Sequence, residues 1–166
     1  DLNSMGIEVI INVNNGSELD PCELGVVYVS EGFNSGVDED YIEIYNSGDN
    51  DCSLEGFQLD NSEDLEDFTF GDIVIPAEGY WIGYENVDSS FSSNLSSEGD
   101  SIVFANSENN TFIVILEQME EIDGIEISQS FDIEGVGCYT EPSPGYINND
   151  CIILENDQYT ILPDKV

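Results

Sequence analysis

The chain carries 37 acidic residues against a single basic side chain, Lys165, and it has no histidine, so its formal net charge is -36 over 166 residues. Self-repulsion of this size opposes any compact state, and we expect salt or divalent cations to stabilise the fold. Because phosphate groups are bound through Lys and Arg, the charge excludes nucleic acid as a partner. It also repels anionic membrane surfaces. Most side chains used in catalysis are missing, so we predict a protein that is not an enzyme and has no catalytic residues and no organic cofactor.

The remaining composition is that of a folded chain. Hydrophobic residues make up 40% and aromatic residues 10% of the sequence, whereas disordered chains are poor in aromatic and β-branched residues. A chain of this length is large enough to bury one core, so we expect a single domain. No apolar run approaches the ~20 residues that a membrane-spanning helix needs, and membrane insertion is not expected.

Short strand-type segments alternate with clusters of Gly, Asn, Asp, Ser and Pro along the chain. In Tyr41–Tyr45, for example, Ile42 and Ile44 face one way, while Tyr41, Glu43 and Tyr45 face the other. The stretch from Gln118 to Asp123 could form one helical turn. This spacing predicts an all-β sandwich or barrel. The predicted strands are Gly6–Val13, Val26–Ser30, Tyr41–Tyr45, Gly56–Leu59, Asp67–Phe70, Tyr80–Tyr84, Ser101–Phe104 and Thr111–Leu116, followed by strand-type segments at Cys151–Leu154 and Gln158–Leu162.

Four motifs, read in order, resemble one known family. They are DYIEIYNSGDNDCSLEGFQL (40–59), FTFGDIVIPAEGYWIGY (68–84), GDSIVFANSENNTFIVIL (99–116) and PSPGYIN (142–148). The first three resemble the hairpins of the lamin tail domain, and the last is similar to the end of its secreted bacterial and archaeal members. The resemblance implies an immunoglobulin-like β-sandwich over residues 25–148. Residues 1–24 and 149–166 would then be N- and C-terminal strand extensions.

Two departures from the family limit what the resemblance implies. Phe57 stands where tryptophan is usual, and the arginine common before the closing Pro-Gly turn is absent. The basic surface of nuclear lamin tails is also missing, so no nuclear or DNA-related role is implied. The fold is therefore the main expectation that the resemblance supplies.

Four widely spaced cysteines, Cys22, Cys52, Cys138 and Cys151, include no CxxC pair, which argues against a zinc site. An even count at long spacing predicts two disulfides in an oxidising compartment; four free thiols in a cytosolic protein are the alternative. Three pairings are possible. Because domain ends tend to lie close together, we expect Cys22–Cys151 and Cys52–Cys138.

Two further features suggest a secreted or cell-surface protein. The chain begins at Asp1 without a charged and then apolar leader, which fits a mature product whose signal peptide has been removed. Three N-x-S/T sequons, at Asn15, Asn94 and Asn109, are possible glycosylation sites. We therefore expect an extracellular location.

Divalent cations are the most credible ligands, because calcium binds six to eight carboxylate, carbonyl or water oxygens. No EF-hand loop occurs, but three loops concentrate acidic residues. The alternative is that these carboxylates are solvated and attract only diffuse counterions. The candidate calcium ligands are Asp38 and Asp40 in the first loop, Asp49 and Asp51 in the second, and Asp64 and Asp67 in the third.

Two functions fit the sequence. In the first, the chain is a structural subunit of an extracellular or cell-surface assembly, such as a filament, held by strand addition and divalent cations. The strand carrying Ile7, Val9, Ile11 and Val13 adds to a neighbouring copy; the same strand could instead pair within its own domain. In the second, a secreted binding module docks to a glycan, a surface or a partner protein through aromatic side chains. An acidic intracellular protein of a halophile is a third option. The candidate contact residues of the second function are Tyr84, Phe91, Tyr139 and Tyr146.

Overall fold

The computed structural model describes residues 19–35, 39–87, 90–155 and 158–161, and these residues form strands, turns and loops without any helix. The strand predicted at Gly6–Val13, with Ile7, Val9, Ile11 and Val13, lies outside the described residues. Asp38 and the sequon at Asn15 lie outside them as well. Within the described part of the chain, no helix is long and apolar enough to cross a membrane.

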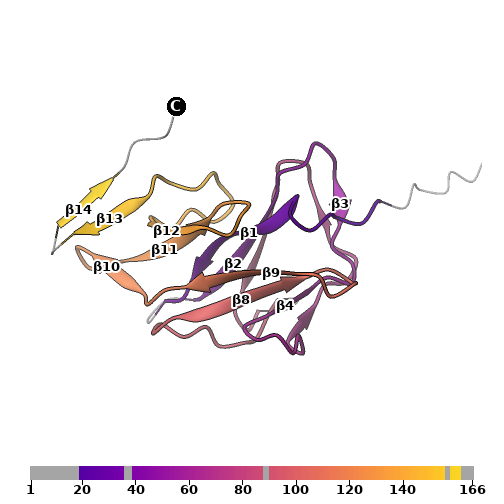
Figure 1. Cartoon of the computed structure of the whole chain (residues 1–166), viewed down its shortest axis with the longest axis horizontal. Coiled ribbons are helices and arrows are strands. Elements are labelled where there is room, and N and C mark those ends of the chain that lie inside the picture. The colour runs from indigo at the N-terminus through magenta and orange to yellow at the C-terminus, as the bar shows by residue number, and fades with distance from the viewer. Residues whose placement is uncertain (1–18, 36–38, 88–89, 156–157, 162–166) are drawn as a thin grey trace, which may run out of the picture.

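Two antiparallel sheets pack face to face (Figure 1). The larger sheet has the strand order β14-β13-β12-β11-β1-β2-β7, with β10 also paired to β11, and the smaller has the order β5-β4-β8-β9. The larger sheet contains β1 (Val27–Phe33), β2 (Tyr41–Asn46), β7 (Tyr80–Tyr84), β10 (Glu120–Ile122), β11 (Ile125–Phe131), β12 (Gly137–Thr140), β13 (Ile152–Glu155) and β14 (Gln158–Ile161). The smaller contains β4 (Gln58–Asp60), β5 (Phe68–Thr69), β8 (Asp100–Ala105) and β9 (Thr111–Leu116), and a separate ribbon pairs β3 (Cys52–Ser53) with β6 (Val74–Ile75).

The core lies between the two sheets and is built by alternate residues of each strand, as the period of two predicts. Apolar side chains from both layers are buried there, which confirms the predicted all-β sandwich. They include Val27 and Val29 of β1, Ile42 and Ile44 of β2, Ile102 and Phe104 of β8, and Val114 and Leu116 of β9.

A β-bulge at Ser30 changes the direction of the side chains that follow it in β1. Val29 pairs with Ile44, but Glu31 pairs with Glu43, so Ser30 is an extra residue in the ladder. The bulge turns Glu31 to the outer face of the large sheet and leaves Gly32 facing the core. A Cβ atom on Gly32 would lie 2.7 Å from the Leu116 Cδ2 atom, so the close packing there requires glycine.

The helical turn predicted at Gln118–Asp123 is wrong. Residues Glu120–Ile122 form β10, which pairs with the start of β11 as a tight hairpin. Asp123 and Gly124 occupy its turn with φ values of 54° and 81°, the left-handed pair that two-residue hairpins favour. The Asp-Gly dipeptide between alternating residues was the signal for this hairpin.

The four cysteines form two disulfides, as predicted, but the predicted pairing Cys22–Cys151 and Cys52–Cys138 is wrong. The structure joins Cys22 to Cys52 and Cys138 to Cys151. A bridge between Pro21 and Ser53 places Cys22 beside β3, and the pairing of Tyr139 with Ile152 places Cys138 beside Cys151. Each bond therefore joins neighbouring segments, and neither connects the two ends of the domain.

Candidate functional site

Two glutamates lie side by side on the outer face of the large sheet. Glu31 and Glu43 are direct partners across β1 and β2, and both are fully buried. Buried carboxylates ordinarily require an ion pair or several hydrogen bonds. Lys165, the only basic side chain of the sequence, lies outside the described residues. Among the described residues, the two buried carboxyl groups must therefore be stabilised by hydrogen bonds and by protonation.

The segment Pro142–Asn148 covers this carboxylate pair and supplies many of its hydrogen bonds. The backbone N–H of Ser143 donates to Glu31 Oε1 at 3.0 Å, and the N–H of Gly145 donates to Glu43 Oε2 at 2.6 Å. The Asn148 amide fixes the far end of the segment by donating to the Ser30 carbonyl at 2.8 Å. We call this arrangement the carboxylate clasp: Glu31 and Glu43 with the covering segment Pro142–Asn148.

Hydroxyl groups complete the clasp from the sheet side. Ser30 Oγ donates to Glu43 Oε1 at 2.7 Å, and Ser128 Oγ donates to Glu31 Oε1. Ser128 in turn contacts Thr140 Oγ1 at 3.2 Å, and Thr140 contacts Ser130 Oγ at 2.7 Å. This network explains why polar residues of β11 and β12 are buried on a face that does not belong to the hydrophobic core.

The environment of the clasp favours a proton on Glu43. Burial is the main cause that raises the pKa of Glu43 to about 7; the nearby charge of Glu31 adds to this, and the donors Gly145 and Ser30 oppose it. Burial and the same two carboxylates also raise the pKa of the Tyr41 hydroxyl, which therefore stays neutral. Glu43 thus titrates near neutral pH.

Paired carboxylates can serve as acid and base in hydrolysis, but this pair is closed to substrates. Both side chains are fully covered, and main-chain donors of the covering segment occupy their outward oxygens. The geometry therefore fits a structural role, holding Pro142–Asn148 against the sheet. The sequence pattern placed Glu43 on the outer face, but Glu31 was missed because a bulge leaves no mark in the alternation.

Asp67, one of the six candidate calcium ligands, is engaged in a local structural contact. Its two oxygens accept hydrogen bonds from the N–H and Oγ groups of both Ser92 and Ser93, at 2.5 to 3.2 Å. Partial burial raises the pKa of Asp67, but these hydrogen bonds outweigh it, so the net effect lowers the pKa. Asp67 ties the segment after residue 90 to the edge of the small sheet.

Replacing Asp67 with alanine is expected to lower the free energy of unfolding by about 2 kcal/mol, because four donor groups lose a charged acceptor. Urea unfolding at neutral pH measures the change. Asp64→Ala is the matched control, since Asp64 is exposed and its carboxylate accepts only from Ser62 Oγ. Equal stability of the two variants would contradict the role given to Asp67.

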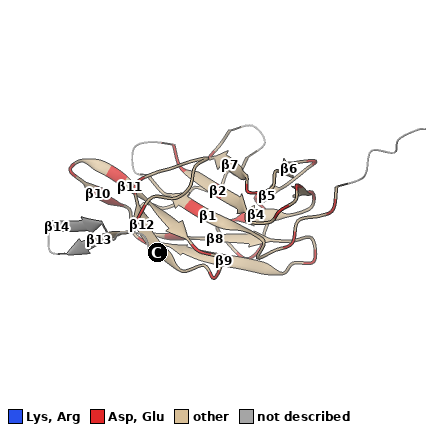
Figure 2. Cartoon of the chain, turned by 90° about the horizontal axis from the view of Figure 1, so that it is seen from above, with Lys and Arg blue, Asp and Glu red and all other residues tan. Residues whose placement is uncertain are grey.

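The other candidate calcium ligands lie in different surroundings. Asp40 is buried, and burial with the charge of Glu85 raises its pKa to about 6. Asp49 and Asp51 line one surface hollow together with Asp20, and Asp51 also accepts a hydrogen bond from the Ala77 N–H. Figure 2 shows the acidic positions scattered over loops and strands. Among the residues that the structure describes, no three acidic or cysteine side chains gather in a metal-binding group.

The candidate contact residues and sequons divide between core and surface. Phe91 is buried in the core, and Tyr139 is partly covered. Tyr84 is 36% exposed, and Tyr146 is 75% exposed next to Ile147 at 85%. The sequon residues Asn94 and Asn109 are both exposed, so an enzyme could reach either one.

A groove runs along β9, the last strand of the small sheet. It has a volume of about 340 Å³ and separates β9 from β11 and β12. Its lining includes Ile113 and Ile115 of β9, which are 42% and 58% exposed, with Phe131, Gly137 and Tyr139 on the opposite wall. Strand β9 contains no charged residue, and Glu117, just after it, lines the end of the groove.

A sequence model described as Lamin Tail Domain matches residues 24–129. No curated protein and no solved structure matches the chain. The matched region runs from just before β1 into β11, so it contains the whole small sheet, the part of the large sheet from β1 to β11, and the Glu31–Glu43 pair. Strands β12, β13 and β14 and the covering segment lie outside it.

Proposed function

Since the chain belongs to the lamin tail domain family, whose members are immunoglobulin-like β-domains, we propose that it is a non-enzymatic structural subunit of an extracellular or cell-surface assembly. Copies join by strand addition, and divalent cations reduce the repulsion between them. Filaments result if the addition runs head to tail without closing.

One observation carries this proposal. The buried apolar side chains described all lie between Cys22 and Ile152, and those of the hydrophobic core fill the space between the two sheets. The strand-type segment Gly6–Val13 precedes this core and is extra to the family match. An apolar extended segment beyond a filled core is suited to pairing with the sheet edge of another molecule, where main-chain hydrogen bonds supply affinity.

The cysteines support a location outside the cytoplasm. All four are paired in disulfides, and such bonds persist mainly in oxidising compartments. The exposed sequons at Asn94 and Asn109 are compatible with that location. The secreted type of the family therefore remains the expected one.

The charge supports a requirement for cations. Each copy carries a formal charge of -36, so approach of two copies is opposed unless salt screens the carboxylates or cations bridge them. Asp49 and Asp51, which share a surface hollow with Asp20, are the pair that we assign to such bridging by calcium or magnesium.

Sedimentation velocity of the full chain tests the proposal. We expect large species in millimolar calcium and smaller ones after chelation, and we expect the substitutions Ile7→Asp and Ile11→Asp together to leave a monomer under both conditions. The double change Asn12→Asp and Asn14→Asp is the matched control, because it adds the same charge without touching the apolar side chains. A wild-type monomer at every calcium concentration would contradict the proposal.

A secreted binding module is the second candidate function, and the exposed pair Tyr146 and Ile147 favours it. These two side chains project from the segment that the clasp holds rigidly, and rigid aromatic side chains are efficient contact residues. The pair would form the centre of a docking surface for a glycan or a protein. The test is binding of the chain to a glycan array or to a cell-surface extract. Binding that Tyr146→Ala does not weaken would remove this candidate.

A further inference from the structure

The two sheets differ in width, and the difference is largest beside β9. Phe68 of β5 stacks on Trp81 of β7, and β9 packs against β1, so the small sheet covers β7, β2 and β1. Beyond β1, the large sheet continues through β11, β12, β13 and β14, which the small sheet does not cover. Strand β9 is thus an edge strand, paired with β8 alone among the described strands, and it borders the wall formed by β11 and β12 (Figure 1).

The outer edge of β9 is left for pairing at Ile115, because Gly135 packs against the Ile113 carbonyl and Gln129 bonds to Glu117. At Glu117, just after the strand, the N–H donates to Gln129 Oε1 at 2.7 Å and the carbonyl accepts from Gln129 Nε2 at 3.1 Å. The Gln129 amide therefore makes the two hydrogen bonds with Glu117 that a neighbouring strand would otherwise make. Because backbone direction repeats every two residues, the N–H and carbonyl groups of Ile115 point to the same side, into the groove.

The low charge of this region makes it a place where two copies can meet. Among the residues that line the groove, Glu117 alone is charged, and the segment Gly6–Val13 has one charged residue, Glu8. Elsewhere the chain averages more than one acidic residue in every five, so contact between most other surfaces is repulsive. The groove wall also offers apolar contacts, since Phe131 and Tyr139 line it opposite Ile113 and Ile115.

We propose that the groove between β9 and the β11–β12 wall is the acceptor for residues 7–13 of a second copy, which extend the small sheet as its fifth strand. Ile7, Val9, Ile11 and Val13 pack against the groove wall, and the edge of the incoming strand pairs with Ile115. This inference rests on the proposed strand-addition assembly and specifies its acceptor surface.

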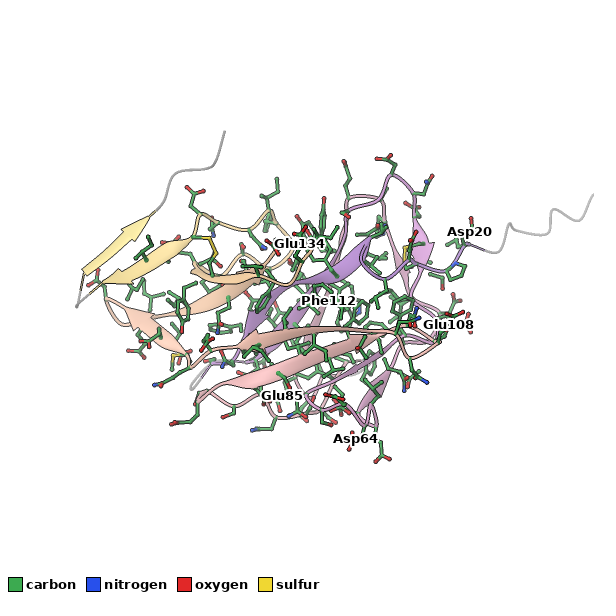
Figure 3. All side chains as sticks on the ribbon, viewed as in Figure 1. Asp20, Asp64, Glu85, Glu108, Phe112 and Glu134 are labelled. Atoms are coloured by element: carbon green, nitrogen blue, oxygen red, sulfur yellow. A yellow bond between two sulfur atoms is a disulfide. The ribbon has the colours of Figure 1, made fainter. Side chains whose placement is uncertain are left out.

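The place where the chain enters the sandwich favours a second copy as the donor. Cys22 is fixed beside β3 by its disulfide and by the bridge from Pro21 to Ser53. Figure 3 shows Asp20 at that end of the molecule, with Phe112 of β9 near the middle. The groove extends from Ile113 to Glu117, away from the β3 end. A strand that leaves one copy at this end and enters the groove of the next generates a head-to-tail contact.

Peptide binding tests the acceptor directly. The probe is a fluorescent synthetic peptide of residues 5–14, and the host is the full chain carrying Ile7→Asp and Ile11→Asp, so that its own strand does not compete. We expect saturable binding by anisotropy and a loss of at least tenfold in affinity when Ile115→Asp is added to the host. Ile125→Asp is the matched control, because Ile125 is 65% exposed on β11 outside the groove, and it should leave affinity unchanged.

A benzophenone-labelled version of the peptide provides a second measurement that needs no groove variant. Cross-links should map to residues 113–117 and 137–139. Binding that Ile115→Asp does not weaken, or cross-links elsewhere, would overturn this acceptor while leaving the assembly proposal intact. If the peptide does not bind although the wild-type chain assembles, the acceptor is likewise overturned and the assembly proposal is kept. A wild-type monomer whose groove is occupied by its own residues 7–13 would overturn both the second-copy donor and the assembly.

Discussion

The free energy of unfolding is expected to fall by about 3 kcal/mol as the pH rises from 5 to 8, and Glu43 is the main cause. Folding raises the pKa of Glu43 from an ordinary 4.5 to about 7, chiefly through burial. Between these values the folded chain holds a proton that the unfolded chain has released. The stabilising contribution of this proton is therefore complete below pH 4.5 and is lost as the pH rises through 7.

The buried carboxyl of Asp40 acts in the same direction. Burial and the charge of Glu85 raise its pKa to about 6, so it also favours the folded state at mildly acidic pH. Its share between pH 5 and 8 is smaller, because its pKa of about 6 lies closer to the start of this range than that of Glu43. General repulsion among surface carboxylates has the same sign too, but high salt suppresses that part.

Urea unfolding in high salt at a series of pH values isolates the contribution of Glu43. Glu43→Gln should remove most of the pH dependence and match or exceed the wild-type stability at pH 8. Its amide oxygen can accept from the Gly145 N–H, and Ser30 Oγ, which donates to Glu43 Oε1 in the wild type, can rotate to accept from the new NH₂ group. A Glu43→Gln variant that keeps the full wild-type slope would contradict this account of the clasp.

Glu31→Gln is the matched comparison for Glu43→Gln. The Glu31 oxygens accept from the Ser143 N–H, Ser143 Oγ and Ser128 Oγ, so an NH₂ group placed there faces donors. We expect a loss of about 2 kcal/mol for this variant, because a buried donor is left without an acceptor. Opposite effects of the same substitution at two adjacent glutamates would be a specific signature of the clasp.

Removing the Cys22–Cys52 disulfide is expected to lower the free energy of unfolding by about 3 to 4 kcal/mol. The bond closes a sequence separation of 30 residues, and its loss frees the unfolded chain of that restraint. Cys22 also belongs to the core, so the change loosens apolar packing as well. The variant Cys22→Ser/Cys52→Ser, compared with the wild type by thermal unfolding, measures the effect.

The second disulfide provides the comparison. Cys138–Cys151 closes a separation of only 13 residues, and the same model gives about 3 kcal/mol for the variant Cys138→Ser/Cys151→Ser. A non-reducing peptide map of the wild-type chain should recover both pairs. A Cys22–Cys151 peptide in that map would contradict the structure.

Alternation of apolar residues was sufficient to place several strands. The predicted limits of Tyr80–Tyr84 and Thr111–Leu116 coincide with those of β7 and β9, because each is a regular strand with clear turn residues on both sides. Strands β11 and β12 were not predicted. Their outward residues, such as Ser128, Ser130 and Thr140, are polar although buried, so hydrophobic periodicity does not mark them.

The features of the candidate site were harder to foresee than the fold. The bulge at Ser30 brings Glu31 beside Glu43, and no residue pattern reveals an extra residue in a ladder. The disulfide pairing was mispredicted because it was inferred from the closeness of domain ends, whereas local strand neighbours determine it. Ile113 and Ile115 are exposed because they alternate with the buried Val114 and Leu116 and face away from the core. The groove beside them depends on which sheet is wider, a property of the assembled layers.

The central claim is that an apolar strand outside the filled core joins copies of this acidic domain. Negative-stain electron microscopy of the full chain in millimolar calcium tests it most directly, with Ile7→Asp/Ile11→Asp prepared in parallel. We expect filaments for the wild type and small single particles for the variant, with both chains showing the same melting temperature. Monodisperse small particles for the wild type, or filaments that persist in the variant, would contradict the claim.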